Sequence, residues 1–352
     1  MPPVRQVHNK APKPGRTYLD AGVNLDAAAA VKERIKRLAA PTLGPGVVSG
    51  PGFFGGVFDP DPRGDTLLVS STDSVGTKVR IAQAMGRSDT VGHDIVNHCV
   101  NDILPAGATP LFFLDYIGIG RLDEDRVAGL VKGLAEACSA AGCALLGGET
   151  ATLPGIYQGD DFDLVGFIVG SVKKNALLTA GATRPGDVLL GLPSSGLHTN
   201  GYSLVRAIFE PETKPAVLSE YVPALGRTLG EALLEPHRSY LPALRPALGK
   251  IRGMAHITGG GFFKNVPRSL AEGLGAEINL RSWTVPPLFR LIQERGQVDE
   301  AEMFRVYNMG VGMVVIVAPE LADEVMAAVP GSWRLGKTIP ASGRDRVLLR
   351  RE

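Results

Sequence analysis

The fold is decided by the stretch TDSVGTK, residues 72–78, and by what surrounds it. It follows an apolar run, TLLVSS at 66–71, which predicts a buried strand. A carboxylate, a glycine, hydroxyls and a lysine are the components of a phosphate-binding loop. Their order nevertheless differs from the G-x-x-x-x-G-K-[ST] pattern of P-loop proteins. The stretch therefore indicates phosphate chemistry in a fold of a different kind.

Periodicity on either side of this stretch predicts two units of mixed secondary structure. In the first half it predicts helices at 26–38, 92–104 and 123–142, and strands at 66–71, 111–119 and 163–172. The turn TRPGD opens a second unit, where strands are expected in DVLLGL, VGMVVIVAP and WRLGKTI and helices in YSLVRAIF, PPLFRLIQERG and ELADEVMAAV. We expect an α+β protein with a disordered tail at 1–17, one domain at 18–174 and another at 175–352.

Composition excludes several classes of function. The chain has 352 residues and a formal charge of +1, so nothing in its charge calls for nucleic acid or an anionic membrane. No apolar run approaches the roughly 18 residues of a spanning helix. Three cysteines without a C-x-x-C motif favour neither a disulfide framework nor a zinc site. The basic, proline-rich start has no apolar core, so a solvated tail is favoured over a transit peptide and a cytoplasmic location is expected.

Two glycine motifs match known patterns without their structural context. GSWRLGKT, 331–338, fits the P-loop pattern, but a helix is predicted before it and IPASGRDR follows where a helix should begin. SGPGFFGGV, 49–57, fits G-x-G-x-x-G, but neither a leading strand nor a following helix is predicted. The second motif is interpreted either as a surface loop or as a flap whose Phe53 and Phe54 exclude water from a nucleotide.

One face of the helix predicted at 92–104 is unusually rich in short polar side chains. At 100° per residue, this face carries Asp94, Asn97, His98, Asn101 and Asp102. A solvated face would more typically carry Lys, Glu and Arg. Two aspartates without a cation on the face favour a bound divalent ion, and oxygen ligands favour Mg²⁺ over zinc. Asp73 and Glu149, each following a predicted strand, extend this picture to a magnesium polyphosphate site.

Five separated motifs together resemble one family. TDSVGTK, HDIVNHCVNDILPAGATPLFFLDY, GCALLGGETATLPGIY, SSGLHTNGYSLVR and HITGGGFFKNVPR occur in order. With them the chain resembles the phosphoribosylformylglycinamidine cyclo-ligases, also called aminoimidazole ribonucleotide synthetases, from about Tyr18 to its last residue. The resemblance implies ATP-dependent ring closure of formylglycinamidine ribonucleotide, with Mg²⁺ as cofactor and ADP and phosphate as products. It also implies a homodimer whose N-terminal sheets complete a shared barrel, and a C-terminal α/β sandwich-like domain.

The resemblance assigns roles to residues that match the family motifs. The residues assigned to catalysis are Lys36, Lys78 and His198. Those assigned to ATP are Gly55, Gly56, Asp73, Gly76, Thr77, Asp94 and Asn101. Those assigned to the substrate are Gly147, Gly148, Glu149, Thr150, Asn200, Gly259 and Gly260. The metal ligands it implies are Asp73, Asp94, Asp102 and Glu149. No residue is assigned as the general base.

The chain departs from the family pattern at a few positions. Ser74 replaces a glycine in TDGVGTK, which predicts that this position does not need a left-handed backbone. Two related kinds of protein remain alternatives, selenophosphate synthetase and thiamine-phosphate kinase. The first commonly uses a reactive cysteine in its N-terminal glycine region, which this chain lacks there, and the second lacks the GGETA and HxTGGGF combination. A non-catalytic nucleotide sensor is a third alternative, which the retained acids and Lys78 oppose.

Overall fold

The computed structural model describes residues 15–50, 52–341 and 346–351, and its elements form two units, each built on a mixed six-stranded sheet. The first sheet has the order β1-β2-β3-β6-β4-β5 and is antiparallel except for the β4–β5 pair. Its strands are β1 (Val47–Ser49), β2 (Gly56–Phe58), β3 (Thr66–Ser74), β4 (Thr109–Ile119), β5 (Ala144–Thr152) and β6 (Phe162–Lys173).

The second sheet has the order β10-β12-β7-β13-β11-β14, with only β11 and β14 parallel. Its strands are β7 (Val188–Pro193), β10 (Ile251–His256), β11 (Leu274–Asn279), β12 (Val311–Val317), β13 (Trp333–Pro340) and β14 (Val347–Arg350). All seven residues of β12 are buried, as expected for an apolar central strand. A separate short hairpin pairs β8 (Tyr221–Val222) with β9 (Arg227–Thr228).

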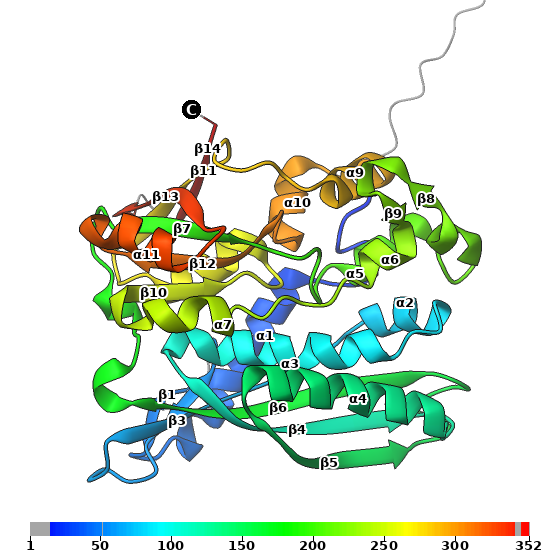
Figure 1. Cartoon of the computed structure of the whole chain (residues 1–352), viewed down its shortest axis with the longest axis horizontal. Helices are drawn as coiled ribbons and strands as arrows, with labels where there is room; N and C mark the ends of the chain where they lie inside the picture. Colours follow the sequence, from blue (N-terminus) through cyan, green and yellow to red (C-terminus); the bar gives the residue numbers. More distant parts are fainter. Residues whose placement is uncertain (1–14, 51, 342–345, 352) are drawn as a thin grey trace, which may run out of the picture.

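Helices separate and cover the sheets (Figure 1). In the first unit they are α1 (Leu25–Ala39), α2 (Lys78–Ala84), α3 (Asp89–Ile103) and α4 (Glu124–Ala141). In the second they are α5 (Tyr202–Phe209), α6 (Leu229–Leu233), α7 (Leu241–Leu244), α8 (Gly261–Asn265), α9 (Pro287–Gly296), α10 (Glu300–Val306) and α11 (Ala322–Ala328). In Figure 1, α3 lies between the first sheet and the second unit, so it has protein on both sides.

The position of α3 is fixed partly by two glycines at its crossing with α4. A Cβ atom on Gly92 would lie 2.6 Å from the carbonyl oxygen of Leu130, and one on Gly133 would lie 2.1 Å from that of Asp89. Both are too close, so only glycine allows the two backbones to approach this closely. The apolar side of α3, including Ile95 at 0% exposure, packs on the first sheet and α4, which leaves its polar side to face the second unit.

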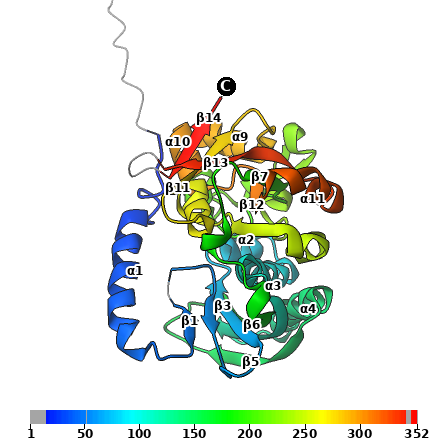
Figure 2. The same cartoon turned by 90° about the vertical axis from the view of Figure 1, so that its left-hand side faces the viewer.

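Helix α1 stands apart from this layered arrangement (Figure 2). Asn24 caps its N-terminus through hydrogen bonds from the backbone N–H groups of Asp26 and Ala27, and none of its residues is buried. Its C-terminal end leads to the β1–β2 hairpin of the first sheet. The helix therefore forms one wall of the space between the two units.

Most predicted elements occur with ends shifted by a few residues. The helix expected at 92–104 begins earlier, at Asp89, and the helix expected at 123–142 ends at Gly142 in a left-handed cap, as predicted. The P-loop match lies on strand β13, so its rejection is confirmed. Ser74 is absent from the described residues with positive φ, whereas Gly76 has φ 69°. Most of the tail expected at 1–17 falls outside the described residues, but the N–H of Arg16 donates to Gly296, 3.2 Å away.

None of the helices in the described residues is long and apolar enough to cross a membrane.

Candidate active site between the two units

A cavity of about 840 Å³ lies between α1, the β1–β2 loop, β3, α3 and the segment that follows β10. Its charged lining residues are Lys32, Glu33, Lys36, Asp73, Asp102, Lys264 and Arg268. Phe53 and Phe54 line it as well, with their rings 5.7 Å apart and edge to face. Of the two interpretations of this glycine loop, the one that places its aromatic rings over a binding space agrees with the structure.

Asp102, on α3, connects the cavity to a group of buried histidines. Its Oδ1 atom lies 2.8 Å from His256 Nδ1, and its Oδ2 lies 3.5 Å from His98 Nε2. His98 Nε2 also lies 2.9 Å from Oδ2 of Asp73, whose side chain is 45% exposed in the cavity. On its other side, His98 Nδ1 lies 2.6 Å from Thr199 Oγ1. Two carboxylates at the cavity are thus joined through one imidazole.

These contacts determine the charges of the groups. Burial disfavours a charged His98, but Asp73 and Asp102 together outweigh burial and raise the pKa of His98 well above its usual value. Burial would likewise raise the pKa of Asp102, yet His98 and His256 lower it. The pKa of Asp73 is also lowered, because the charge of His98 overcomes desolvation. Both acids are therefore ionised and can carry a cationic ligand.

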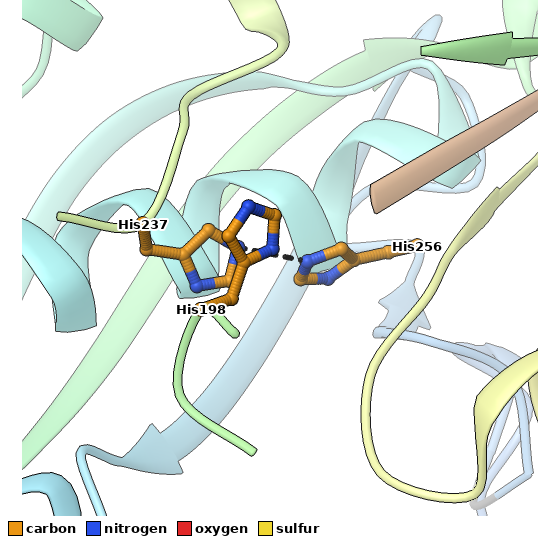
Figure 3. Close-up of side chains that lie close together, drawn as sticks. All are labelled: His198, His237 and His256. Carbon is orange, nitrogen blue, oxygen red and sulfur yellow. Dashed lines mark hydrogen bonds between the residues drawn. The ribbon is translucent and has the colours of Figure 1, made fainter. Parts of the chain in front are cut away.

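His256 also belongs to a cluster of three histidines that comes entirely from the second unit (Figure 3). His198 follows β7, His237 follows α6 and His256 ends β10. The rings of His198 and His237 stack with centroids 3.9 Å apart, and Nε2 of His237 lies 3.0 Å from Nε2 of His256. Burial lowers the pKa of all three, so they are neutral near pH 7. One nitrogen from each lies within 4.8 Å of the others, a spacing that could admit a transition metal.

The polar side of α3 is occupied by backbone of the second unit. Lys78 Nζ and both amide side chains donate to carbonyl groups: Lys78 to Glu235 at 2.8 Å, Asn97 to His237 at 2.7 Å and Asn101 to Arg238 at 2.8 Å. The N–H groups of His237 and Tyr240 donate in return to Asp94 and Asn101, at 2.7 and 2.9 Å. We call residues 235–240 the latch segment. Backbone groups of the latch segment therefore cover most of this part of the helix.

The sequence interpretation of this face was wrong in one respect, because a cation is present. Lys78 reaches it from the start of α2, and its Nζ lies 2.8 Å from the Asp94 carboxylate. Both side chains are fully buried, so neither lines the cavity. Asn101 is also fully buried. These three predicted site residues therefore join the two units rather than contact the space where a ligand would bind.

Most of the other predicted site residues fall into three groups, which line the cavity, lie near it or are remote from it. Lys36, Asp73, Asp102, Asn200 and Gly259 line the cavity. Gly55 and Gly56 lie at the start of β2 beside it, and Thr77 contacts Ser203, with their hydroxyl oxygens 3.2 Å apart. Those on β5 are remote within one chain: Gly147, Gly148, Glu149 and Thr150.

Strand register shows why Glu149 does not join Asp73 in one chain. Asp73 pairs with Gly166, which pairs with Asp115, which pairs with Gly148. Three strand spacings separate the two positions, or about 14 Å. Glu149 is one residue further along β5, so its side chain points to the opposite face of the sheet. The four predicted metal ligands therefore do not form one site within a chain.

Sequence reasoning missed His237 and Arg268. His237 follows EP in the run LLEPHRSY and belongs to no periodic pattern. Arg268 lay within the quoted motif HITGGGFFKNVPR but received no role. The spacing of the motif gives no sign that its arginine faces the cavity.

Comparisons with known proteins agree with this architecture. Residues 55–172 match the family model for the N-terminal domain of AIR synthase related proteins, and residues 184–346 match the model for their C-terminal domain. The chain thus belongs to the two-domain class of AIR synthase related proteins.

Curated relatives narrow this class. The phosphoribosylformylglycinamidine cyclo-ligase of Desulfitobacterium hafniense is 50% identical over 313 residues, 88% of this chain and 91% of that protein. That of Caldicellulosiruptor bescii is 48% identical over 341 residues, 95% of this chain and 99% of that protein. The chain belongs to the phosphoribosylformylglycinamidine cyclo-ligase family.

Solved structures show the same fold at low sequence identity. The structure described as AaThiL complexed with AMPPCP and TMP is 14% identical to this chain and has a TM-score of 0.64. The match covers 94% of this chain and 96% of that one. Thiamine-monophosphate kinase from Stenotrophomonas maltophilia is 18% identical, with a TM-score of 0.60, and covers 90% of this chain and 96% of its own. These similarities concern the fold alone.

Proposed function

We propose that this chain cyclises formylglycinamidine ribonucleotide to aminoimidazole ribonucleotide with release of ADP and phosphate, in de novo purine biosynthesis, and that the cavity between the units is its active site. Family membership over nearly the full length of the relatives supports the reaction. The observation that carries the location is the pair of ionised carboxylates, Asp73 and Asp102, on the cavity wall.

The chemistry requires a phosphate donor and a dry site. An amide oxygen is a poor leaving group until it is phosphorylated, so the formyl oxygen attacks the γ-phosphate of ATP and the amine then closes on the activated carbon. Water would hydrolyse that intermediate, and therefore the site must exclude it. We assign this role to Phe53 and Phe54, which line the cavity. We assign Lys36, Asn200 and Gly259 to ligand contacts from the opposite walls.

Magnesium fits only part of the predicted ligand set. Asp73 and Asp102 present oxygen ligands to the cavity, and their ionised state suits a hard divalent cation. Asp94 does not fit, because it lies outside the cavity and is paired with Lys78 and the N–H of His237. Held by Asp73 and Asp102, Mg²⁺ would neutralise charge on the phosphates. His198 stacks on His237 behind this wall, so we assign it to positioning of His237 rather than to catalysis.

We also propose that two chains pair through the first sheet to form a barrel. The side of this sheet opposite α3 is uncovered, and large apolar side chains remain exposed on it: Leu111 at 44%, Leu146 at 64% and Phe167 at 38%. Edge strand β5 has five consecutive exposed residues, Leu146–Thr150. An exposed edge of this kind invites pairing with another chain. Such a pairing would bring Glu149 and its neighbours close to a partner.

The dimer proposal is tested by sedimentation of Phe167→Lys, with the exposed Leu122→Lys as a matched control. The first substitution should give monomers and the second should leave dimers intact. A wild-type chain that sediments as a monomer at micromolar concentration would contradict the proposal. The domain limits of 18–174 and 175–352 and a cytoplasmic location are proposed with it.

The reaction is tested by ADP release in the presence of Mg²⁺. Release should require formylglycinamidine ribonucleotide, and aminoimidazole ribonucleotide should form in equal amount. Thiamine phosphate serves as the competing substrate. ADP release with thiamine phosphate and none with the ribonucleotide would overturn the assignment. Binding of ATP without ADP release from either substrate would indicate a nucleotide sensor.

A further inference from the structure

Arg268 is the arginine in the cavity lining, and its guanidinium has no carboxylate in contact with it among the described residues. Arg268 lies on the short 3₁₀ helix Val266–Ser269, which follows α8, and its Cζ is 4.9 Å from the centroid of the Phe54 ring. Among the described residues, no carboxylate lies within 4.0 Å of its guanidinium. Lys36, on the opposite wall, is by contrast paired with Glu33 at 2.8 Å.

The surroundings of Arg268 disfavour its charge, yet an arginine remains ionised. Burial lowers its pKa, and only the more distant Asp102, already bound to His98 and His256, opposes this. A guanidinium stays protonated in proteins. Lys264, its neighbour in the cavity, donates to the carbonyl oxygen of Leu25, at 2.9 Å, and among the described residues no carboxylate lies within 4.0 Å of its ammonium. Two positive charges in a partly desolvated wall without a carboxylate in contact are unfavourable unless a ligand supplies the anion.

We infer that Arg268, supported by Lys264, binds a phosphate monoester, and that this group is the 5′-phosphate of the ribonucleotide substrate. The inference rests on the proposed function for the identity of the substrate, and on the geometry for the class of ligand. ATP is the other source of phosphate. Its polyphosphate binds together with a cation and therefore suits the Asp73 and Asp102 wall, whereas a metal-free monoester dianion needs positive side chains.

The shape of the site favours arginine over lysine. Two parallel N–H groups of a guanidinium can donate to two oxygens of one phosphate group. The Cζ atom of Arg268 lies over the Phe54 ring, 4.9 Å from its centroid, and a cation over an aromatic face is attracted to it. This contact keeps the guanidinium beside Phe54. A lysine would keep the charge but lose the second hydrogen bond to the phosphate.

Steady-state kinetics of Arg268→Gln test the assignment, with Arg334→Gln as the matched control. Arg334 lies on β13 and pairs with Asp323 at the surface. In Arg268→Gln, KM for formylglycinamidine ribonucleotide should rise about 100-fold while KM for ATP changes less than about 3-fold. Arg268→Lys should show an intermediate rise, and the control should match wild type. An unchanged KM for the ribonucleotide, or a rise confined to ATP, would overturn the assignment.

A binding measurement separates this inference from the proposed reaction. Ribose 5-phosphate, which carries the same monoester, should raise the melting temperature of wild type and of Arg334→Gln but not of Arg268→Gln. If wild type lacks cyclo-ligase activity and ribose 5-phosphate still stabilises it through Arg268, the reaction is wrong and the monoester site stands. If ribose 5-phosphate stabilises wild type and Arg268→Gln equally, the monoester site is wrong whatever the activity. Circular dichroism of each variant excludes misfolding as the cause.

Discussion

The ammonium of Lys78 lies 2.8 Å from the carboxylate of Asp94, and neither side chain is exposed to solvent. Burial alone would neutralise both groups, because it lowers the pKa of the lysine and raises that of the aspartate. The two groups can be buried because their opposite charges attract each other and because Lys78 also donates to the carbonyl group of Glu235. The lysine of TDSVGTK thus joins the two units through Asp94 and the carbonyl group of Glu235.

Lys78→Met should destabilise the protein strongly without removing a contact to ATP. The change leaves the Asp94 charge buried without its partner, which typically costs about 3–5 kcal/mol. Urea unfolding measures this loss. The double variant Lys78→Met/Asp94→Leu should recover part of the stability, because no unpaired charge remains. A stable Lys78→Met protein with a greatly raised KM for ATP would instead place the lysine at the nucleotide.

Asp102→Asn should lower turnover by at least about 100-fold and should also lower stability. Both effects have one cause: the carboxylate carries charge into the cavity, hydrogen-bonds with His256 and Ser71, and forms an ion pair with His98. Asp89→Asn, on the same helix, is the control, since Asp89 pairs with Arg87 at the surface and does not line the cavity. The Mg²⁺ concentration that gives half-maximal ADP release should rise only for Asp102→Asn. Equal Mg²⁺ dependence in both variants would remove Asp102 from the metal site.

His198→Asn should reduce the loss of stability in mild acid. Burial holds the pKa of His198 well below its ordinary value, so near pH 6 the unfolded chain binds a proton there that the native protein does not. Native stability from this group is full above about pH 6.5 and is lost as pH falls, by up to about 1.4 kcal/mol per pH unit. Asparagine suits the backbone at this position, where φ is 63°.

Urea unfolding at pH 7.5, 6.5 and 5.5 should show a shallower acid slope for His198→Asn than for wild type. Above pH 7 the two slopes should coincide, because a neutral imidazole has no proton left to lose. Identical slopes below pH 6.5 would mean that His198 is protonated in the native state.

Lys337→Met should leave ATP turnover close to the wild-type value. Lys337 lies on β13, pairs with Glu277 at 3.4 Å and is 58% exposed. Loss of such a surface pair costs about 0–1 kcal/mol. ADP release and the KM for ATP measure the outcome. A folded variant that no longer binds ATP would restore the P-loop interpretation of this segment.

Sequence patterns predicted the helices and strands because interactions between residues close in the sequence largely determine these elements. The i+3 and i+4 apolar spacing of 123–142 and the glycine after it specify helix α4 and its end without reference to the rest of the chain. The P-loop match was rejected on similar grounds, since Trp333 and Leu335 alternate as strand residues do.

Contacts between distant parts of the chain could not be predicted in this way. A helical wheel shows that Asp94 and Asn101 share a face, but not that backbone from 235–240 covers it. Glu149 was grouped with Asp73 because both follow strands, and only the register shows that they point to opposite faces of the sheet. The sequence did not single out Arg268, because what distinguishes it is the lack of a contacting carboxylate among the described residues. That lack can be recognised only from the three-dimensional structure.

Side chains of α3 contact the backbone of the latch segment, and this determines which substitutions the latch segment tolerates. The polar side chains of α3 and Lys78 meet carbonyl and N–H groups that every residue except proline supplies. Side chains at 235, 238 and 239 can therefore diverge while the path of the chain stays constant. Proline at 237 or 240 would remove a donor that Asp94 or Asn101 requires. In a collection of random variants, positions 235, 238 and 239 should accept varied residues, whereas proline should be excluded at 237 and 240.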